Sequence, residues 1–491
     1  MSGATDNKDG FLPPPAGEIL GHPKALWNLF GAEFWERFMY YGMRAMLAVH
    51  VAAAFFAHLG DGARAQASLT FGGYTSMVYM TGIAGGFVAD RILGYQRSIM
   101  LGGALMAVGM FMLMAPDLTT FLLGLAVIVV GNGLFKPNIS TMVGRLYAPD
   151  DVRRDSGFTI FYMGINAGGA LAPLVCGTLI GARFGYEWGF FTAGIGMLLG
   201  LAVFQWRIAR MGEIGRPPAG GEGIARTLVV VLGALVSVPL VYLLLNQKTL
   251  VGWLLIGLFL ALTVFFIASG VRSRDKVQLH RYIAMLLLFL AKILFWGMFE
   301  QAGSSLNFFA KDHVDAPFDF TVFQSANPVF IILLAPLFAW LWPRLEARGV
   351  NPSIPRKFGI AVILVAIGFT SLVWSIGNLQ DGNARIPWEM LALAYMINTM
   401  GELCLSPIGL SMVSKLASAR DTGLAMGAWF LCTAIGNFVA GAVAAQASGG
   451  ALGGIAQYAS TYTQIAIAGF AFGAAFLLFA PLINKLMHGV K

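Results

Sequence analysis

Long apolar segments, separated by short polar loops, dominate the sequence. A helix needs about 20 largely apolar residues to cross the hydrocarbon core of a bilayer. Fourteen segments approach or exceed that length, and no soluble domain of any size remains between them. They lie at 27–57, 68–90, 97–114, 118–145, 155–181, 188–208, 224–245, 249–270, 281–310, 320–343, 356–377, 387–414, 421–446 and 461–487. The sequence therefore predicts an all-α polytopic membrane protein with fourteen transmembrane helices.

Composition supports this class and disfavours others. Hydrophobic residues make up 57% of the chain and charged residues 11%, whereas a typical soluble domain is about 25% charged. The three cysteines lie in apolar stretches and form no CxxC pair, and no HExxH motif occurs. We therefore expect no metal site, no cofactor and no enzymatic activity.

The positions of the basic residues predict the orientation in the membrane. Most of the 32 Lys and Arg residues lie in loops on the same side as the N-terminus. Because cytoplasmic loops carry an excess of Lys and Arg, we expect both termini to be cytoplasmic. The net charge of +8 then faces anionic lipid head groups, so nucleic acid is not expected as a partner.

A Gly/Pro-rich stretch at 211–223 follows the first six segments and suggests a division of the chain. Six plus six helices around a central connection is the major facilitator fold, whose substrate site lies between the halves. Here the fold would carry one inserted helix pair. The predicted parts are a disordered cytoplasmic tail at 1–26, a six-helix bundle at 27–210, a linker with two extra transmembrane helices at 211–275, a second bundle at 276–487 and a short tail at 488–491.

Eight ionisable residues lie within the predicted spans, where each costs about 2.5–3.5 kcal/mol on insertion scales. They are Glu33, Glu36, Arg37, Arg44, Lys136, Lys292, Glu300 and Glu402. Among these eight, Arg37, Arg44 and Lys136 belong to the first six segments, whereas Glu300 and Glu402 belong to the last six. A cavity between the halves would be positive on one wall and negative on the other, which suits a small zwitterion with an amine and a carboxylate.

The first segment concentrates these charges on one face. At helical spacing, Glu33, Glu36, Arg37, Tyr40, Tyr41 and Arg44 share one stripe. Two carboxylates within a turn of an arginine titrate as a coupled group, because each bound proton changes the charge that the others feel. Such a group could act as a proton-driven switch. The alternative is an ion-pair cluster that only holds helices together. For Lys292, snorkelling toward the cytoplasmic end of its span and a functional role both stay open.

Three motifs resemble those of the proton-dependent oligopeptide transporter family. Residues 33–41, EFWERFMYY, match the ExxERFxYY motif of its first helix. Residues 85–94 match GGxxADRxxG, and residues 161–168 match FYxxINxG. The last motif usually continues with Gly-Ser, but Gly169 follows Gly168 here. The proton-handling histidine of animal members is absent from the second segment, so the chain resembles a bacterial member.

The resemblance implies proton-coupled import of di- and tripeptides by alternating access. Glu33, Glu36, Arg37 and Glu300 would couple protonation to gating, with Glu300 exchanging partners with Arg37. Arg37, Arg44 and Lys136 would hold the peptide carboxylate, while Glu402, Asn166 and Asn327 would hold the amino terminus. The remaining expected lining residues are Tyr40, Tyr41, Tyr79, Tyr162, Trp296, Ser406, Trp429 and Phe430. Asp90 and Arg91 would form a gate latch at the cytoplasmic loop.

The expected partners are small peptides, protons and membrane lipids, with the proton gradient in place of a cofactor. The expected location is a bacterial inner membrane, and the expected functional unit is a monomer. Three alternatives stay open at this point. They are a related transporter of amino acids or nitrate, a facilitator-type drug exporter and an intramembrane enzyme.

Overall fold

The computed structural model describes residues 14–148, 150–218, 223–379, 385–450 and 452–490. The helices are α1 Lys24–Ala54, α2 Gly62–Met80, α3 Gly82–Val88, α4 Tyr95–Met112, α5 Leu118–Arg145, α6 Arg154–Ala172, α7 Ala182–Phe184, α8 Tyr186–Trp206, α9 Ile224–Asn246, α10 Lys248–Arg272, α11 Lys276–Phe299, α12 Ser305–His313, α13 Ala326–Ala347, α14 Ile354–Gly377, α15 Trp388–Leu416, α16 Thr422–Gly449 and α17 Gly454–Leu486. Short 3-10 or π turns are η1 Ala57–Leu59, η2 Ala89–Leu93, η3 Pro173–Gly181, η4 Ile208–Met211, η5 Glu300–Gly303 and η6 Phe320–Ser325. Two two-stranded ladders complete the described elements: β1 Glu18–Ile19 with β2 His22–Pro23, and β3 Val314–Asp315 with β4 Ile386–Pro387.

Each of the fourteen predicted segments coincides with one helix or with consecutive helical pieces. The predicted segments at 68–90, 155–181 and 281–310 are interrupted by a turn or by π or 3-10 geometry, which hydropathy does not reveal. In the described part of the chain, eleven helices are long and apolar enough to cross a membrane. The prediction of a polytopic helical membrane protein is therefore confirmed.

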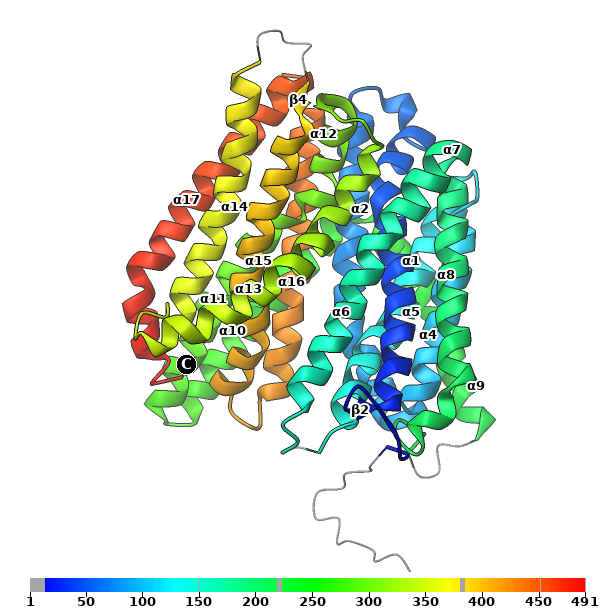
Figure 1. The fold of residues 1–491 in the computed structure, drawn as a ribbon, viewed down its shortest axis with the longest axis vertical. Coiled ribbons are helices and arrows are strands. Elements are labelled where there is room, and N and C mark those ends of the chain that lie inside the picture. Colours follow the sequence, from blue (N-terminus) through cyan, green and yellow to red (C-terminus); the bar gives the residue numbers. More distant parts are fainter. Residues whose placement is uncertain (1–13, 149, 219–222, 380–384, 451, 491) are drawn as a thin grey trace, which may run out of the picture.

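The helices form two bundles that stand side by side (Figure 1). In one half, α1 packs on α6 and α8, and α4 packs on α5. In the other half, α14 packs on α15 and α17, and α11 packs on α16. The closest contact between the halves joins α2 to α16. The C-terminus and β2 lie at the same end of the bundles, which we call the terminal side, and the opposite end is the distal side.

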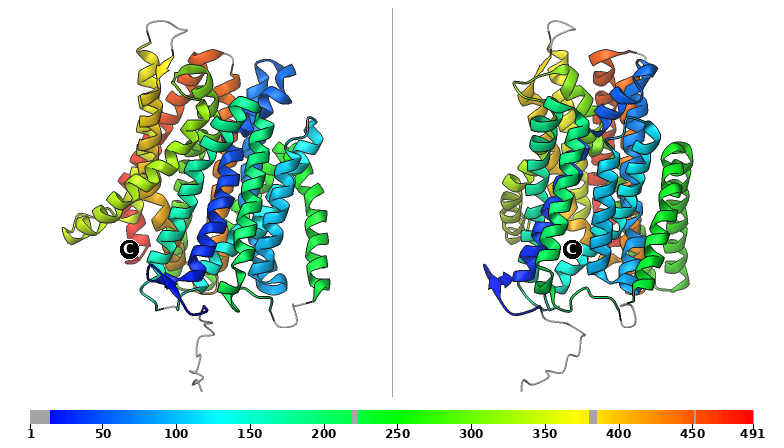
Figure 2. Two further views of the ribbon diagram at one scale, coloured as in Figure 1. Left: turned by 45° about the vertical axis from the view of Figure 1, so that its right-hand side comes forward. Right: turned by 90° about the vertical axis from the view of Figure 1, so that its right-hand side faces the viewer.

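The inserted pair α9 and α10 contacts both halves. Helix α9 packs on α5, whereas α10 packs on α11 and α16. The right-hand view of Figure 2 shows the pair in green at the margin of the molecule. Gly252 of α10 faces the ring of Phe438 on α16, where an added Cβ would lie 3.0 Å from the ring. The inserted pair thus lies beside the junction between the halves.

Two glycines of the family motifs stand where a side chain would not fit. Gly168 of α6 lies directly against the backbone carbonyl of Phe34 on α1. Gly94 has φ +75° at the start of α4, and an added Cβ would lie 2.6 Å from the backbone of Arg216. Glycine is favoured in such left-handed and closely approached positions because it has no Cβ.

The residues before α1 correct one prediction. We expected disorder throughout 1–26, but α1 begins at Lys24 and β1 and β2 form a small antiparallel ladder. Glu18 pairs with Arg153 at 2.7 Å, and His22 Nδ1 lies 2.8 Å from the hydroxyl of Tyr147. These partners lie more than 120 residues away, so local composition gave no sign of them. Residues 1–13 lie outside the described residues.

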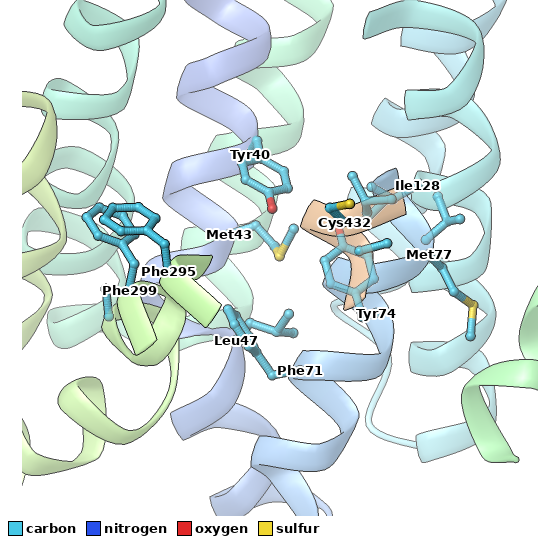
Figure 3. Close-up of a cluster of buried hydrophobic side chains, with 14 of the residues drawn as sticks. Tyr40, Met43, Leu47, Phe71, Tyr74, Met77, Ile128, Phe295, Phe299 and Cys432 are labelled. Carbon is cyan, nitrogen blue, oxygen red and sulfur yellow. The ribbon is translucent and has the colours of Figure 1, made fainter. Parts of the chain in front are cut away.

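Buried apolar side chains fill the junction around the charged residues. Figure 3 shows Tyr40, Met43 and Leu47 of α1 beside Phe71 and Tyr74 of α2, with Phe295 and Phe299 of α11 nearby. The rings of Phe295 and Phe299 stack with centroids 5.4 Å apart. Closely packed side chains of this kind hold their neighbours in fixed positions.

Candidate substrate-binding site

A small cavity of about 50 Å³ lies between the two halves. Its described lining residues are Tyr41, Arg44, Tyr79, Trp296, Phe299, Glu300, Ala302, Gln324, Asn327, Tyr395 and Glu402. They come from α1 and α2 of one half and from α11, η5, η6, α13 and α15 of the other. The lining is typical of small-molecule sites, in which aromatic walls surround a few polar groups. Of the predicted substrate-binding residues, Tyr41, Arg44, Tyr79, Trp296, Asn327 and Glu402 are brought together here.

An ion pair crosses the cavity between the halves. Arg44 Nη2 of α1 donates to Glu300 Oε2 at 2.6 Å, and both side chains are largely buried. The guanidinium of Arg44 also lies 5.9 Å from the ring centroid of Tyr41. Glu300 begins η5, where α11 ends. We expected Glu300 to exchange partners with Arg37. In this structure its partner is Arg44, about two helical turns further along the same stripe of α1.

Glu33, Glu36 and Arg37 form a second, fully buried cluster within α1. Arg37 pairs with Glu36 through Nε and Nη2, and its Nε lies 3.3 Å from Glu33 Oε1. Asn132 of α5 donates to Glu36 at 3.4 Å, whereas Glu33 Oε2 has no hydrogen-bond partner. One guanidinium neutralises one carboxylate, so the cluster holds a net negative charge unless a proton is bound. A proton on the free Glu33 oxygen would balance that charge.

Glu402 of α15 is the acidic group on the opposite wall. Asn327 Nδ2 of α13 donates to Glu402 Oε2 at 2.8 Å and lies 3.1 Å from the hydroxyl of Thr399. In the described part of the chain, Glu402 has no basic partner. A buried carboxylate that is held in place but not neutralised is suited to receive a cation from the cavity.

Lys136 of α5 lies half-buried beside the cavity, and its described neighbours do not include an ion-pair partner. Its Nζ stands 5.2 Å from the ring centroid of Tyr79, which lines the cavity. A lysine held by a cation–π contact keeps its charge available for an anion. Lys136 itself is not among the lining residues, and its role in holding the peptide carboxylate stays a prediction.

Several predicted lining residues lie outside the cavity. Asn166 Nδ2 donates to the carbonyl of Tyr162 at 2.9 Å, within its own helix. Tyr162 is 38% exposed, and Tyr40 is buried with its ring centroid 5.1 Å from the guanidinium of Arg37. Ser406 is half-buried, and its hydroxyl has no hydrogen-bond partner. Their roles in substrate binding stay predictions.

Trp429 and Phe430 of α16 are also outside the cavity. Trp429 is buried beneath Lys292, whose Nζ donates to the Trp429 carbonyl at 2.7 Å and lies 3.5 Å from the ring centroid. Phe430 is 41% exposed. The structure thus disfavours one of the two alternatives for Lys292, and a functional role stays a prediction. Its ammonium group does not snorkel to the end of the span but is buried within the second half.

The predicted gate residues lie on the terminal side of the first half. Asp90 accepts a hydrogen bond from the hydroxyl of Tyr95 and lies 4.0 Å from Arg145 Nη2. Arg91 is exposed. The described partners of Asp90 thus belong to its own half. A latch formed by Asp90 and Arg91 stays a prediction.

Four lining residues were not predicted: Phe299, Ala302, Gln324 and Tyr395. Gln324 and Tyr395 are polar residues in apolar segments, which is a signal that the sequence contains. The search for binding residues was based on the cost of burying ionisable groups, so it found the charged residues and did not include these neutral ones.

An ion pair and hydrogen bonds connect the halves on the distal side. Arg64 of α2 pairs with Asp312 of α12 at 2.7 Å. Thr178 of η3 lies 2.9 Å from Thr321 of η6, oxygen to oxygen. In addition, Asn307 Nδ2 donates to the carbonyl of Ala45 at 2.8 Å. Direct contacts between the halves therefore exist on the distal side.

Comparison with known proteins agrees with these observations. The model of the POT family matches residues 96–459. The chain belongs to the POT family. Its relatives include the peptide transporter YePEPT of Yersinia enterocolitica, 35% identical over 97% of this chain and 98% of the relative. A di-/tripeptide transporter of Lactococcus lactis is 37% identical over 84% of this chain and 87% of the relative.

Solved structures of POT family members share the whole fold. A mutant of a peptide transporter POT in complex with alafosfalin has a TM-score of 0.83 and 35% identity, covering 97% of this chain and 98% of its own. A POT family transporter in complex with 5-aminolevulinic acid has a TM-score of 0.81 and 30% identity, covering 96% and 99%. The major facilitator arrangement expected from the sequence is thereby confirmed.

Proposed function

We propose that this POT family protein imports di- and tripeptides together with protons. The observation that carries the proposal is the dipolar cavity, in which Arg44 stands on one wall and Glu402 on the other. Relatives named as peptide transporters support it. Alafosfalin and 5-aminolevulinic acid, bound by two POT family structures, are small molecules with an amino group and an acidic group.

In the proposed binding mode, the peptide bridges the two halves. Its carboxylate binds Arg44, with Lys136 and Arg37 adding positive charge. Its ammonium group binds Glu402, which Asn327 holds in position at 2.8 Å. Aromatic walls from Tyr41, Tyr79 and Trp296 offer contact area without demanding one hydrogen-bond pattern, so many side chains are tolerated.

Proton coupling follows from competition for Arg44. When Glu300 is ionised it occupies Arg44, and a proton on Glu300 frees the guanidinium for the peptide carboxylate. The cluster of Glu33, Glu36 and Arg37 exchanges its proton in the same cycle. Each ligand thus shifts the population between two arrangements of the halves, as alternating access requires.

The proposal includes a location and an orientation. The protein is a multi-pass membrane protein, and we place it in the bacterial cytoplasmic membrane with the terminal side in the cytoplasm. The contact of Arg64 with Asp312 then lies on the external side. The proton gradient is the energy source, no cofactor takes part, and a single chain transports.

Uptake of Ala-Ala into proteoliposomes with an imposed inward proton gradient tests the proposal. We expect accumulation that a protonophore abolishes, and Glu36→Gln should lose it. Excess 5-aminolevulinic acid and excess nitrate serve as competitor arms. Uptake of Ala-Ala that is equal with and without the gradient, or full gradient-driven uptake by Glu36→Gln, would contradict the proposal. Strong inhibition by nitrate alone would favour an anion transporter of the same family.

A further inference from the structure

The helix that carries Glu300 is broken directly at the cavity. Helix α11 ends at Phe299, η5 spans Glu300–Gly303, and α12 begins at Ser305. A break of this kind leaves backbone carbonyls without their helical partners. A buried carbonyl that stays without a hydrogen bond is unfavourable, so other groups must supply donors.

The side chain of Gln324 supplies one of them. Its Nε2 donates to the carbonyl of Ala302 at 2.6 Å and lies 3.2 Å from both Asn307 Oδ1 and the hydroxyl of Tyr395. The Tyr395 hydroxyl itself donates to the Ala302 carbonyl at 3.3 Å. Ala302, Asn307, Gln324 and Tyr395 are all buried. Because acceptors surround Nε2, the NH2 end of the Gln324 amide, and not its oxygen, faces the break after α11.

The same network reaches both partners of the ion pair. Ala302 follows Glu300 by two residues within η5. Asn307 donates to the carbonyl of Ala45, the residue next to Arg44, at 2.8 Å. The amide of Gln324 therefore connects the backbone beside Glu300 with the backbone beside Arg44. Loss of this amide would alter the separation between the two charges without removing either of them.

We propose that Gln324 is a positioning residue that sets the geometry of the Arg44–Glu300 pair, and with it the pH dependence of transport. The inference rests on the proposed function, because its main readout is proton-driven uptake. Gln324 also lines the cavity, so the experiment separates positioning from direct contact with the peptide.

Two substitutions test the role of the donor. Gln324→Leu removes both amide hydrogens and shortens the side chain by one bond. Gln324→Glu can donate to the Ala302 carbonyl when protonated and repels it when ionised. The matched control is Gln457→Glu in α17, where another buried amide donates to the carbonyl of Gln446 at 2.8 Å, away from the cavity. For each variant, the pH profile of gradient-driven Ala-Ala uptake and the KM of Ala-Ala counterflow are measured.

We expect Gln324→Glu to lose at least tenfold in gradient-driven uptake at neutral pH and to recover at acidic pH, with the counterflow KM changed less than about twofold. Gln324→Leu should lose uptake without recovery, and Gln457→Glu should keep the wild-type profile. An unchanged pH profile in both Gln324 variants would overturn the inference. A raised counterflow KM with an unchanged profile would also overturn it, because it would identify Gln324 as a peptide contact.

A second measurement does not depend on the substrate. In a double-mutant cycle, the thermal unfolding of Gln324→Glu, Glu300→Gln and the double variant is compared with that of the wild type. If Gln324 acts through the ion pair, the shifts in Tm are non-additive. Additive shifts would contradict positioning, even if the wild type transports a different solute. Lack of peptide uptake by the wild type would instead contradict the proposed function alone.

Discussion

Arg44 and Glu300 form an ion pair that joins the two halves at the wall of the cavity. Their side chains meet at 2.6 Å although 256 residues separate them in the sequence. Removing one partner of a buried ion pair costs about 3–5 kcal/mol, because the remaining charge is left without compensation. A bound carboxylate can provide that compensation for Arg44. Arg44 therefore has two alternative anionic partners, the Glu300 carboxylate and the carboxylate of a substrate.

Glu300→Gln is expected to uncouple transport from the proton gradient. The neutral amide cannot hold Arg44 as an ion pair, so the guanidinium is available to peptide at every pH. We expect gradient-driven Ala-Ala uptake in proteoliposomes to fall at least tenfold while counterflow exchange persists. Glu346→Gln, an exposed glutamate on α13, is the control and should behave as wild type. Undiminished gradient-driven uptake in Glu300→Gln would refute this role of the pair.

Glu402→Ala is expected to weaken the binding of peptides that have a free amino terminus. Hydrogen bonds to charged groups contribute about 1.5–3 kcal/mol, so the KM for Ala-Ala should rise roughly 10- to 100-fold. Acetyl-Ala-Ala lacks the ammonium group, and its inhibition constant should change little. Glu389→Ala, on an exposed position of the same helix, serves as control. An equal loss for the free and the acetylated peptide would argue against an ammonium site at Glu402.

The sequence predicted the membrane-spanning helices and the charged core of the site, because both rest on strong local signals. Apolar length gave the spans, and the cost of buried charge pointed to Arg44, Glu300 and Glu402. The stripe on α1 correctly placed Glu33, Glu36 and Arg37 together, since 3.6 residues per turn fixes which side chains share a face.

Long-range partners could not be predicted in the same way. The pairing of Glu300 with Arg44 rather than Arg37 depends on how α11 breaks, and hydropathy is insensitive to such a break. Gln324 and Tyr395 contribute through hydrogen bonds to the backbone carbonyl of Ala302. The sequence shows them as polar residues in apolar segments, but it does not show which group they contact. Trp429 was expected in the cavity, but its ring covers Lys292 instead. Only the packing of α11 against α16 decides that placement.

Weakening the contact between Arg64 and Asp312 is expected to expose the distal side. The two side chains are partly exposed, so the pair contributes about 0.2–1 kcal/mol, or up to roughly fivefold in a conformational equilibrium. Ala52 lines a second cavity together with Arg64 and Asp312, so Ala52→Cys places a thiol beside this pair. The native cysteines Cys176, Cys404 and Cys432 are buried. A membrane-impermeant thiol reagent should therefore report mainly on the introduced group.

With Ala52→Cys as background, Arg64→Ala should raise the labelling rate up to about fivefold at low ionic strength. High salt should reduce the difference, because it screens a partly exposed pair. Exchanging the charges, with Arg64→Asp and Asp312→Arg together, should restore the slower rate. The contact would have no gating role if the labelling rate were the same in Ala52→Cys alone, with Arg64→Ala added, and with the exchanged charges.

Asp421→Asn is expected to remove part of the pH dependence of stability. Asp421 precedes α16 on the terminal side, and its carboxylate accepts from the hydroxyls of Tyr282 at 2.6 Å and Ser269 at 2.9 Å. The hydrogen bond from Tyr282 lowers the pKa of Asp421 below its usual value. A lowered pKa in the folded state stabilises the protein above the unfolded pKa of about 3.9, and the stabilisation is lost as pH falls further.

Thermal unfolding of purified protein between pH 7 and pH 3 checks this expectation. The amide can still accept both hydrogen bonds but without charge, so Asp421→Asn should lose about 1 kcal/mol at pH 7. The difference in Tm from wild type should shrink as the pH approaches 3. Tyr282→Phe, which removes the main donor, should reduce the pH dependence in the same direction. A constant difference in Tm across the range would show that the ionised carboxylate does not tie α10 and α11 to the start of α16.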